Sequence, residues 1–381
     1  MNTEPEKKLF KDWFDAEAAR MLGEQIHGAW PKFPVKHFES LAAKNLADLE
    51  FHGRVHQFAD ALATCLPEDV SAALKILRNS LPPLKADNEP MNDGWLQWPV
   101  GHFIAEHGLA DFEGSFETMI ELTQRFSSEF AVRPFVEQEP RRTFAVLLEL
   151  TSHESAHVRR WCSEGVRPRL PWGKRLNALV HDPSPIWPIL DALKDDPSLY
   201  VRKSVANCIN DITKDHPEAV LDRMEAWQKN AGAGRAWIIR HALRSLIKAG
   251  HPRALALMGY SPHPPINVSL RAKPARCKTG DSVTLEADLE NTTGKPQSLM
   301  LDLLVSFPGK TGVLREKVFK WTTLELDPHA ARTLRKTLPL FRVTTTRSLY
   351  PGEHFIELQI NGGRYGRECV VLLFHGGEEP R

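Results

Sequence analysis

The feature that most constrains the fold is an internal repeat within the first 260 residues. The segment "HVRRWCSEG" at 157–165 recurs as "YVRKSVANCINDI" at 200–212, which is 43 residues later. Each segment follows another stretch with helical spacing of apolar residues, "TFAVLLELT" and "IWPILDALK" respectively. Helix pairs repeated at a period of about 40 residues are typical of HEAT-type proteins. One pair cannot bury its apolar faces alone, so such pairs stack into a curved α-solenoid.

The texture of the sequence changes near residue 260. Before this point, apolar residues recur at i, i+3 and i+4, with breaks at Pro and Gly. After it come short β-rich runs, from "INVSLRA" to "CVVLLFH", separated by turn signals such as "NTTGK" and "NGG". About seven short strands in this length are typical of an immunoglobulin-like (Ig-like) β-sandwich, with a small β-barrel as the alternative. We therefore predict a helical repeat domain over 1–260, a linker at 261–266 and an Ig-like sandwich over 267–381.

The composition excludes several classes of protein. The chain has 381 residues and a formal net charge of +1, which argues against a protein that coats nucleic acid but leaves a local basic face possible. We find neither a signal peptide nor an apolar run long enough to cross a membrane, so a cytoplasmic location is expected. The five cysteines are scattered, and the 16 histidines include no H-E-x-x-H motif. No metal and no cofactor are expected.

A cationic residue recurs at one phase of the successive repeats, as Arg160, Lys203 and Arg240. Along one face of a solenoid, these side chains would form a basic stripe that matches the phosphates of a DNA duplex. The alternative is structural, because arginines in such helices also pair with an aspartate of the neighbouring repeat. Asp195 and Asp196 are available for that purpose. The pattern alone leaves both interpretations open.

One carboxylate lies in an unusually basic stretch. Residues 155–175 contain six Lys or Arg residues and a single acid, Glu164, which shares a helix face with Arg160. By the repeat register, Asn207 matches Glu164, and Asp211 lies one turn further along the same face; Glu129 precedes the first repeat. The simple interpretation is an exposed salt bridge, which is worth little.

An acid in a DNA-binding groove weakens binding unless it meets a positive charge on the ligand. Cleavage of an N-glycosidic bond creates such a charge, because the sugar gains oxocarbenium character in the transition state. Trp172, between Pro171 and Gly173, has a suitable ring for stacking on a sugar or a base, or for a cation–π contact with a charged lesion. The alternative for Trp172 is that it caps a hydrophobic loop.

Four longer segments carry a resemblance to a known family: "RFSSEFAVRPF", "HVRR" with the following "SEG" and "RPRLPW", "DDPSLYVRKSVANCINDITKDHP" and "WIIRHALRSLIKAGHPRALALMGY". They resemble the AlkC branch of bacterial DNA alkylation-repair proteins, HEAT-like repeat glycosylases related to AlkD. The resemblance covers the helical half closely. It extends to the C-terminal part, because members of this branch carry an Ig-like module there. Trp161 differs from the smaller apolar residue of many relatives, and we interpret it as a packing residue.

The resemblance implies an activity. Enzymes of this branch remove positively charged N3-alkylated bases, 3-methyladenine and 3-methylcytosine, from double-stranded DNA without extruding the base. The implied protein is a monomer that acts in base excision repair and associates with the nucleoid. No Lys is placed to form a Schiff base, so a monofunctional glycosylase without lyase activity is expected.

The resemblance also implies roles for individual residues. Glu164 is expected to be the main carboxylate facing the sugar, with Glu129 and Asp211 flanking it. Trp172 is expected to contact the lesion, and Arg160 the adjacent backbone. Further DNA-contact candidates are basic residues of the repeats: Arg159, Arg167, Arg169, Lys203, Arg240 and His241.

Two questions stay open at this stage. The Ig-like module is expected to contact the duplex through basic loop residues such as Lys310 or Arg347, and deletion from about residue 264 onward is expected to impair activity. The rival hypotheses are a catalytically silent DNA-binding or damage-sensing protein, and a scaffold for protein partners.

Overall fold

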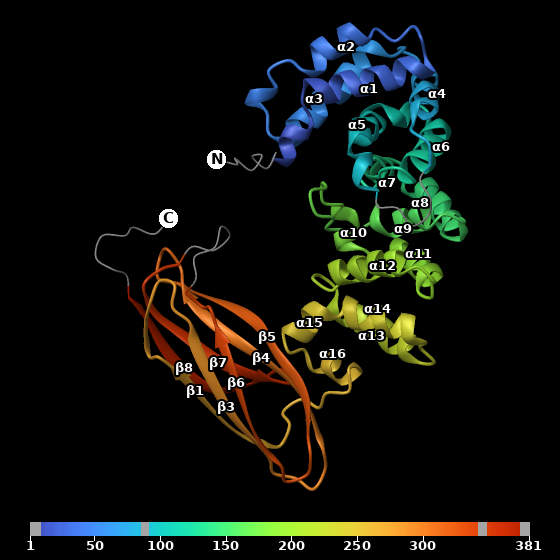
Figure 1. The fold of residues 1–381 in the computed structure, drawn as a ribbon. Helices are drawn as coiled ribbons and strands as arrows, with labels where there is room; N and C mark the ends of the chain where they lie inside the picture. The colour runs from blue at the N-terminus through green and yellow to red at the C-terminus, as the bar shows by residue number, and fades with distance from the viewer. Residues whose placement is uncertain (1–8, 85–90, 342–348, 374–381) are drawn as a thin grey trace. The chain divides into compact units, whose positions relative to one another are not determined.

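Helices occupy the chain up to residue 257, and strands follow from residue 266 (Figure 1). The computed structural model describes residues 9–84, 91–341 and 349–373. By its internal contacts, the chain divides into two compact units. The first comprises Met1–His216 and Asn230–Ala242, and the second comprises Pro217–Lys229 and Leu243–Arg381. The domain boundaries at 260 and 267 remain predictions, because this division assigns some helices to the second unit.

The first unit begins with helices that pack as neighbouring pairs: α1 (Ala16–Ala29), α2 (Val35–Ala42), α3 (Phe51–Cys65), α4 (Val70–Ser80), α5 (Trp98–His107), α6 (Phe112–Thr123) and α7 (Arg133–Gln138). Three of them begin at an aspartate whose carboxylate accepts a hydrogen bond from the first turn: Asp15, Asp69 and Asp111. Helix α3 packs against both α2 and α5. The aspartate caps thus fix the first residues of α1, α4 and α6. The apolar faces of the helices determine which of them pack together.

The predicted repeats follow as α8 (Pro140–Glu149) with α9 (Ala156–Glu164), and α11 (Trp187–Leu193) with α12 (Leu199–Ile212); α14 (Ala233–Ala242) comes next. Helix α12 packs between α9 and α14, and α11 packs on α8. Within this unit the helices stack along a curve, with α10 (Asn177–His181) on its inner side (Figure 1). Trp161 is fully buried, with its ring 6.0 Å from that of Phe116 on α6, as expected of a packing residue. The predicted helical solenoid is confirmed.

The two repeats share a local hydrogen-bond pattern at the start of their second helices. Arg159 donates to the carbonyl oxygens five and six residues before it, at 2.7 and 2.9 Å. Arg202 does the same at 2.8 and 2.7 Å. Arg159 also donates from Nε to Asp196 Oδ2 of the next repeat at 2.7 Å. The structural interpretation of a repeated arginine therefore holds at this position.

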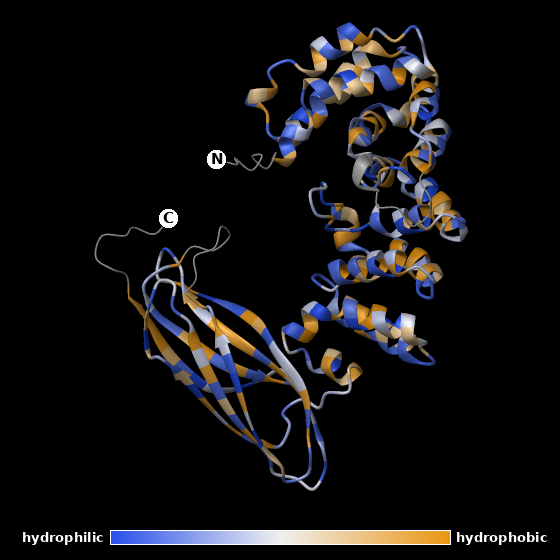
Figure 2. Cartoon of the chain, viewed as in Figure 1, coloured by the Kyte–Doolittle hydropathy of each residue, from blue (hydrophilic) through white to orange (hydrophobic). Residues whose placement is uncertain are grey.

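The second unit contains a sandwich of two sheets, with strands β1 (Ile266–Lys273), β2 (Arg276–Lys278), β3 (Val283–Asn291), β4 (Gln297–Pro308), β5 (Leu314–Leu326), β6 (Ala331–Leu338), β7 (Gly352–Ile360) and β8 (Gly363–Leu373). One sheet has the order β1-β3-β6 and the other β2-β8-β7-β4-β5. Alternate residues of β3 are buried, and Figure 2 shows hydrophobic and hydrophilic residues alternating along the strands. The predicted Ig-like sandwich is confirmed. Its three-residue β2 lies outside the runs used for the prediction.

Helices α13 (Pro217–Gln228), α15 (Arg244–Lys248) and α16 (Pro252–Leu257) belong to the same unit as the sandwich. Gln359 on β7 donates to the carbonyl oxygen of Lys248 at 3.1 Å. Gly250 has φ +78, and a Cβ there would come within 2.6 Å of the Gly362 Cα, so glycine permits this close approach. No helix in the described part of the chain has the length and apolar character needed to cross a membrane.

Candidate active site

Three carboxylates and three cations form a connected cluster at the repeat helices. Arg160 Nη1 lies 2.5 Å from Glu129 Oε2, and Arg160 Nη2 lies 3.5 Å from Glu164 Oε1. The same Glu164 oxygen accepts a hydrogen bond from Arg167 Nη1 at 2.6 Å. Arg167 Nε in turn donates to Asp211 Oδ2 at 2.8 Å. The predicted catalytic carboxylates are therefore joined through two arginines, and Lys214 Nζ completes the cluster at 3.0 Å from Asp211 Oδ1.

The carboxylates differ in exposure. The side chains of Glu164 and Asp211 are 6% and 4% exposed, whereas that of Glu129 is 16% exposed. Burial alone would raise the pKa of Glu164, but Arg160 and Arg167 outweigh it and hold this pKa below its usual value. Glu164 is therefore an anion at neutral pH, which suits electrostatic stabilisation of a cation and rules out a proton donor.

The basic stretch is less unbalanced in three dimensions than in sequence. Glu164 is a single acid in residues 155–175, but the folded chain brings acids from other segments to most of the cations. Asp196 pairs with Arg159, Asp215 with Arg169, and Glu137 with Lys174. The lone anion of the sequence is thus a member of a charge-matched network. The other acids that pair with the cations of this stretch lie 31 to 46 residues from them in the chain, so a local count does not include them.

The candidate DNA-contact residues fall into two groups. The first group forms ion pairs within the protein, so the geometry does not favour a contact with phosphate; it comprises Arg159, Arg160, Arg167 and Arg169. Lys203 and Arg240 are exposed, and among the described residues neither has an ion-pair partner. His241 stacks on Trp237, with ring centroids 4.8 Å apart. The exposed cations lie on α12 and α14, which pack against each other.

Trp172 lies in a loop whose backbone is fixed from within. Arg133 on α7 donates hydrogen bonds to the carbonyl oxygens of Gly165 and Arg167, both at 3.0 Å, and to that of Lys174. Burial lowers the pKa of Arg133 to about 10, which leaves it cationic at neutral pH. The backbone of Trp172 has φ +64, a left-handed conformation that residues other than Gly and Asn rarely adopt. The backbone on both sides of Trp172 is therefore held by Arg133.

Trp172 is 66% exposed, so most of it is accessible to a ligand. Its neighbours come from the first hundred residues. Trp98 lies nearly parallel to it, at 6.3 Å between ring centroids and an interplanar angle of 18°. Phe10 and Phe51 lie at 6.0 and 6.1 Å, and His52 at 6.2 Å. The N-terminal helices thus supply an aromatic wall for Trp172, for which the sequence contained no motif.

A pocket of about 370 Å³ opens beside Trp172. Aromatic rings form much of its wall, and Ser127 lines it as well. Ser127 donates to Glu129 at 2.9 Å, so it connects the pocket to the carboxylate cluster. Histidines line another part: His52, His56 and His102. Burial, with a smaller effect of the two neighbouring histidines, lowers the pKa of His102 to about 4.

Sequence reasoning missed Ser127 and Arg133, although both lie in the quoted motif "RFSSEFAVRPF". Their roles depend on hydrogen bonds to residues 32 to 41 positions away and on the pocket that they border, and no local sequence pattern reports these. Of the predicted contacts in the Ig-like module, Lys310 is exposed in the turn between β4 and β5. Arg347 lies outside the described residues.

Comparison with known proteins identifies relatives of this chain. The C-terminal Ig-like domain of the uncharacterised protein YhaZ, as a family model, matches residues 267–373. The uncharacterized protein YhaZ of Bacillus subtilis (strain 168) is 35% identical over 354 residues, 92% of this chain and 96% of that protein. The chain belongs to the same family as YhaZ.

A solved structure of this family matches nearly the whole chain. Pseudomonas fluorescens AlkC superposes with a TM-score of 0.88 at 37% identity, covering 96% of this chain and all of the AlkC chain. The predicted resemblance to AlkC is confirmed by this match. That protein is described as an alkylpurine DNA glycosylase, and its structure holds DNA containing an abasic site analog. Both the helical repeats and the Ig-like sandwich are included in this likeness, so the two-part architecture is a property of the family.

Proposed function

We propose that this protein is a monofunctional DNA glycosylase that excises alkylated bases from double-stranded DNA. The observation that carries the proposal is a cluster of three buried or half-buried carboxylates, Glu129, Glu164 and Asp211, connected through Ser127 to the pocket beside the exposed Trp172. The likeness to a DNA-bound glycosylase over nearly the whole chain supports it. We assign positively charged N3-alkylated bases, 3-methyladenine and 3-methylcytosine, as the substrates. The chain would act as a monomer on nucleoid DNA in the cytoplasm.

The chemistry follows from the charge of the lesion. When the bond between C1′ of the sugar and the base nitrogen breaks, both electrons leave with the base, which departs neutral. The positive charge passes to the sugar, and a water oxygen then bonds to C1′ and releases a proton. Carboxylates held ionised and in fixed positions stabilise the sugar cation in the transition state. A donor of protons to the base is not required.

We assign the three carboxylates to one unit rather than to separate steps. Glu164 lies at the centre of the cluster between two arginines, and Glu129 lies at its more exposed edge, bonded to Ser127 of the pocket wall. Arg160 and Arg167 hold the pKa of Glu164 below its usual value, and their bonds orient the three carboxylates. Trp172 would contact the sugar or base of the lesion, and Lys203 and Arg240 would bind the phosphate backbone.

The decisive experiment measures release of free 3-methyladenine, and formation of abasic sites, from methylated duplex DNA. Glu164→Gln removes the charge while keeping the side-chain volume. A charge pair at about 4 Å in an effective dielectric near 20 is worth about 4 kcal/mol, so excision should fall by about a thousandfold. Affinity for DNA should be retained. Glu154→Gln, an exposed carboxylate ten positions earlier in the chain, is the matched control and should excise at the wild-type rate.

Other outcomes identify the rivals. A wild-type protein that binds duplex DNA with a steep dependence on salt but releases no base is a damage-sensing protein without catalysis. Negligible binding that does not respond to salt indicates a scaffold. If Glu164→Gln excises normally, the assignment of Glu164 is wrong even when the activity is present.

The proposal also keeps the lesion stacked in the duplex, and the pocket beside Trp172 makes that part testable. A duplex with 2-aminopurine at the target position brightens when this base leaves the stack. We expect little change on binding. A large increase that Trp172→Ala abolishes would instead show that the base is extruded.

A further inference from the structure

Two neighbouring helices of the first unit place two histidines that are not part of the carboxylate cluster against each other. His56 lies on α3, and His102 lies on α5, where Glu106 follows one turn later. Residues four apart in a helix share one face, so His102 and Glu106 point the same way. Helix α3 packs against α5, which brings His56 opposite this pair. His56 and His102 are 46 residues apart in the chain, and no compact motif contains them.

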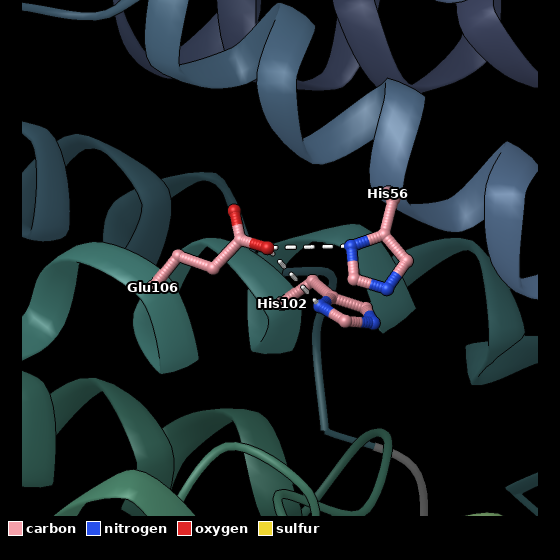
Figure 3. Close-up of side chains that lie close together, drawn as sticks. All are labelled: His56, His102 and Glu106. Atoms are coloured by element: carbon pink, nitrogen blue, oxygen red, sulfur yellow. Dashed lines mark hydrogen bonds and ion pairs between the residues drawn. The ribbon is translucent and has the colours of Figure 1, made fainter.

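The three side chains converge (Figure 3). One oxygen, Glu106 Oε1, lies 3.3 Å from His56 Nδ1 and 4.0 Å from His102 Nδ1. The two imidazole centroids are 3.9 Å apart. One ligand atom from each residue can be chosen so that all three lie within 4.8 Å of one another.

We propose that His56, His102 and Glu106 bind a divalent transition-metal ion, Zn²⁺ in the first instance. Two imidazole nitrogens and one carboxylate oxygen are a ligand set that zinc uses in proteins. Three protein ligands leave a coordination position open, and His56 and His102 both line the pocket described above. The open position would therefore be available to water or to a small oxygen or nitrogen ligand in that pocket.

The distances match this ion. Zinc–nitrogen bonds of 2.0–2.1 Å put two ligands of a tetrahedral site about 3.3–3.4 Å apart. The His56–Glu106 distance of 3.3 Å already fits, and the His102–Glu106 distance of 4.0 Å needs a shift of less than 1 Å. Small rotations about the side-chain torsions of Glu106 are enough for such a shift, because its carboxylate lies at the end of a flexible side chain.

An ordinary hydrogen bond between His56 and Glu106 explains part of this geometry and leaves part unexplained. His102 Nδ1 is buried and has no hydrogen-bond partner among the described residues, although it faces the Glu106 oxygen. A buried polar atom without a partner destabilises the fold. Coordination of a metal would satisfy this nitrogen. The side chains of His56 and Glu106 are 49% and 35% exposed, which gives the ion a path into the site.

The test uses the full chain with any affinity tag removed, stripped of metal with a chelator. Cys369 is an exposed thiol, so the measurements are made in a Cys369→Ser background. Zn²⁺ binding is followed by isothermal titration calorimetry, and Co²⁺ binding by its visible absorption, which reports nitrogen and oxygen coordination. We expect one ion per chain. Loss of a hydrogen-bond partner of a ligand typically lowers metal affinity about 10- to 100-fold, so loss of the ligand itself should lower it at least as much.

The variants are His56→Ala, His102→Ala and Glu106→Gln, and each should weaken binding. His37→Ala is the control, because His37 is an exposed histidine of the same unit outside the cluster, and it should bind as the background does. Circular dichroism in chelator shows whether each variant is folded, and Glu106→Gln keeps the side-chain volume. Binding that is absent, substoichiometric or unchanged by all three variants overturns the proposal. The result is independent of whether the protein excises bases.

Discussion

The two helical repeats place different chemistry on the same backbone. At equivalent positions, 43 residues apart, the first repeat carries Arg160, Glu164 and Arg167, and the second carries Lys203, Asn207 and Asn210. The first set forms a buried ion-pair cluster. In the second set, Asn210 donates to the carbonyl oxygen of Ala242 at 2.7 Å, and Lys203 is exposed.

The comparison of the two repeats distinguishes residues that maintain the repeat fold from residues of the candidate active site. Arg159 and Arg202, also 43 residues apart, make the same bonds to the preceding loop in both repeats, so they belong to the scaffold. A packing role does not require buried charges one turn further on, since the second repeat packs with amides there. Buried ion pairs are weak stabilisers, because desolvation opposes their attraction. At these three positions the first repeat buries charges where the second has amides or an exposed lysine, and this difference points to function.

The largest effect on stability is expected from Arg167→Met. This change leaves Glu164 and Asp211 buried with one cation fewer, and removal of one partner of a buried ion pair typically destabilises by about 3–5 kcal/mol. Asn210→Leu, at the equivalent position, leaves one buried carbonyl oxygen without its donor, which costs about 1–3 kcal/mol. Urea unfolding followed by circular dichroism compares the two. Equal losses would mean that the charges of the first repeat have no special energetic weight.

A second prediction concerns the ring of Trp172. Stacking of a base on an aromatic side chain is worth about 1–3 kcal/mol, so Trp172→Ala should lower excision by roughly ten- to a hundredfold. Folding should be unaffected, because the ring is 66% exposed. Trp172→Gly removes the ring and also relieves the left-handed backbone at φ +64. If the ring is what matters, both variants lose activity although Gly is the more stable of the two. Recovery of activity in Trp172→Gly would instead implicate the backbone.

The fold was predictable because its signals are local. The 43-residue repeat and the helical spacing of apolar residues predicted the stacked helices, and alternation with turn signals predicted the sandwich. Strand β2 could not be predicted from the sequence, because a strand of three residues, Arg276–Lys278, is too short to show a pattern of alternation. The grouping of α15 with the sandwich was also hidden. It depends on Gly250 meeting Gly362, which lies 112 residues later.

The site was only partly predictable, because charge balance is a property of the folded chain. The repeat register and the family resemblance identified Glu164 and Asp211 as candidate catalytic residues. In the structure, both pair with Arg167. The acids that neutralise Arg159 and Arg169 lie in other repeats, so a local count overstated the free positive charge. The aromatic neighbours of Trp172 come from helices whose sequence shows nothing beyond helical periodicity.

The pH dependence of stability provides a third prediction. The folded protein holds the pKa of Glu164 below its ordinary value of 4.5, so the unfolded chain binds more protons in that range. The resulting stabilisation is complete above about pH 4.5 and is lost as pH falls through the lower, folded-state pKa. Glu164→Gln should flatten this acid limb by at most about 1.4 kcal/mol per pH unit. Glu154→Gln should leave it unchanged. Thermal melts between pH 3 and 7 give the comparison, and an unaltered limb in Glu164→Gln would contradict the assigned ion pairing.

The smallest expected effect tests the exposed cations of the later repeats. Lys203→Ala and Arg240→Ala should each reduce the slope of log affinity against log salt by about 1, because each removes one phosphate contact. The loss should be the same for methylated and unmethylated duplexes, since phosphates carry no information about the base. Lys32→Ala removes an exposed lysine at the other end of the unit and should leave the slope unchanged. Arg169→Ala is the more informative comparison. Arg169 is already paired with Asp215, so its removal should also leave the slope unchanged. A slope that drops for Arg169→Ala but not for Lys203→Ala would mean that the first repeat opens its ion pairs to the DNA, and that the division between site and phosphate track lies elsewhere.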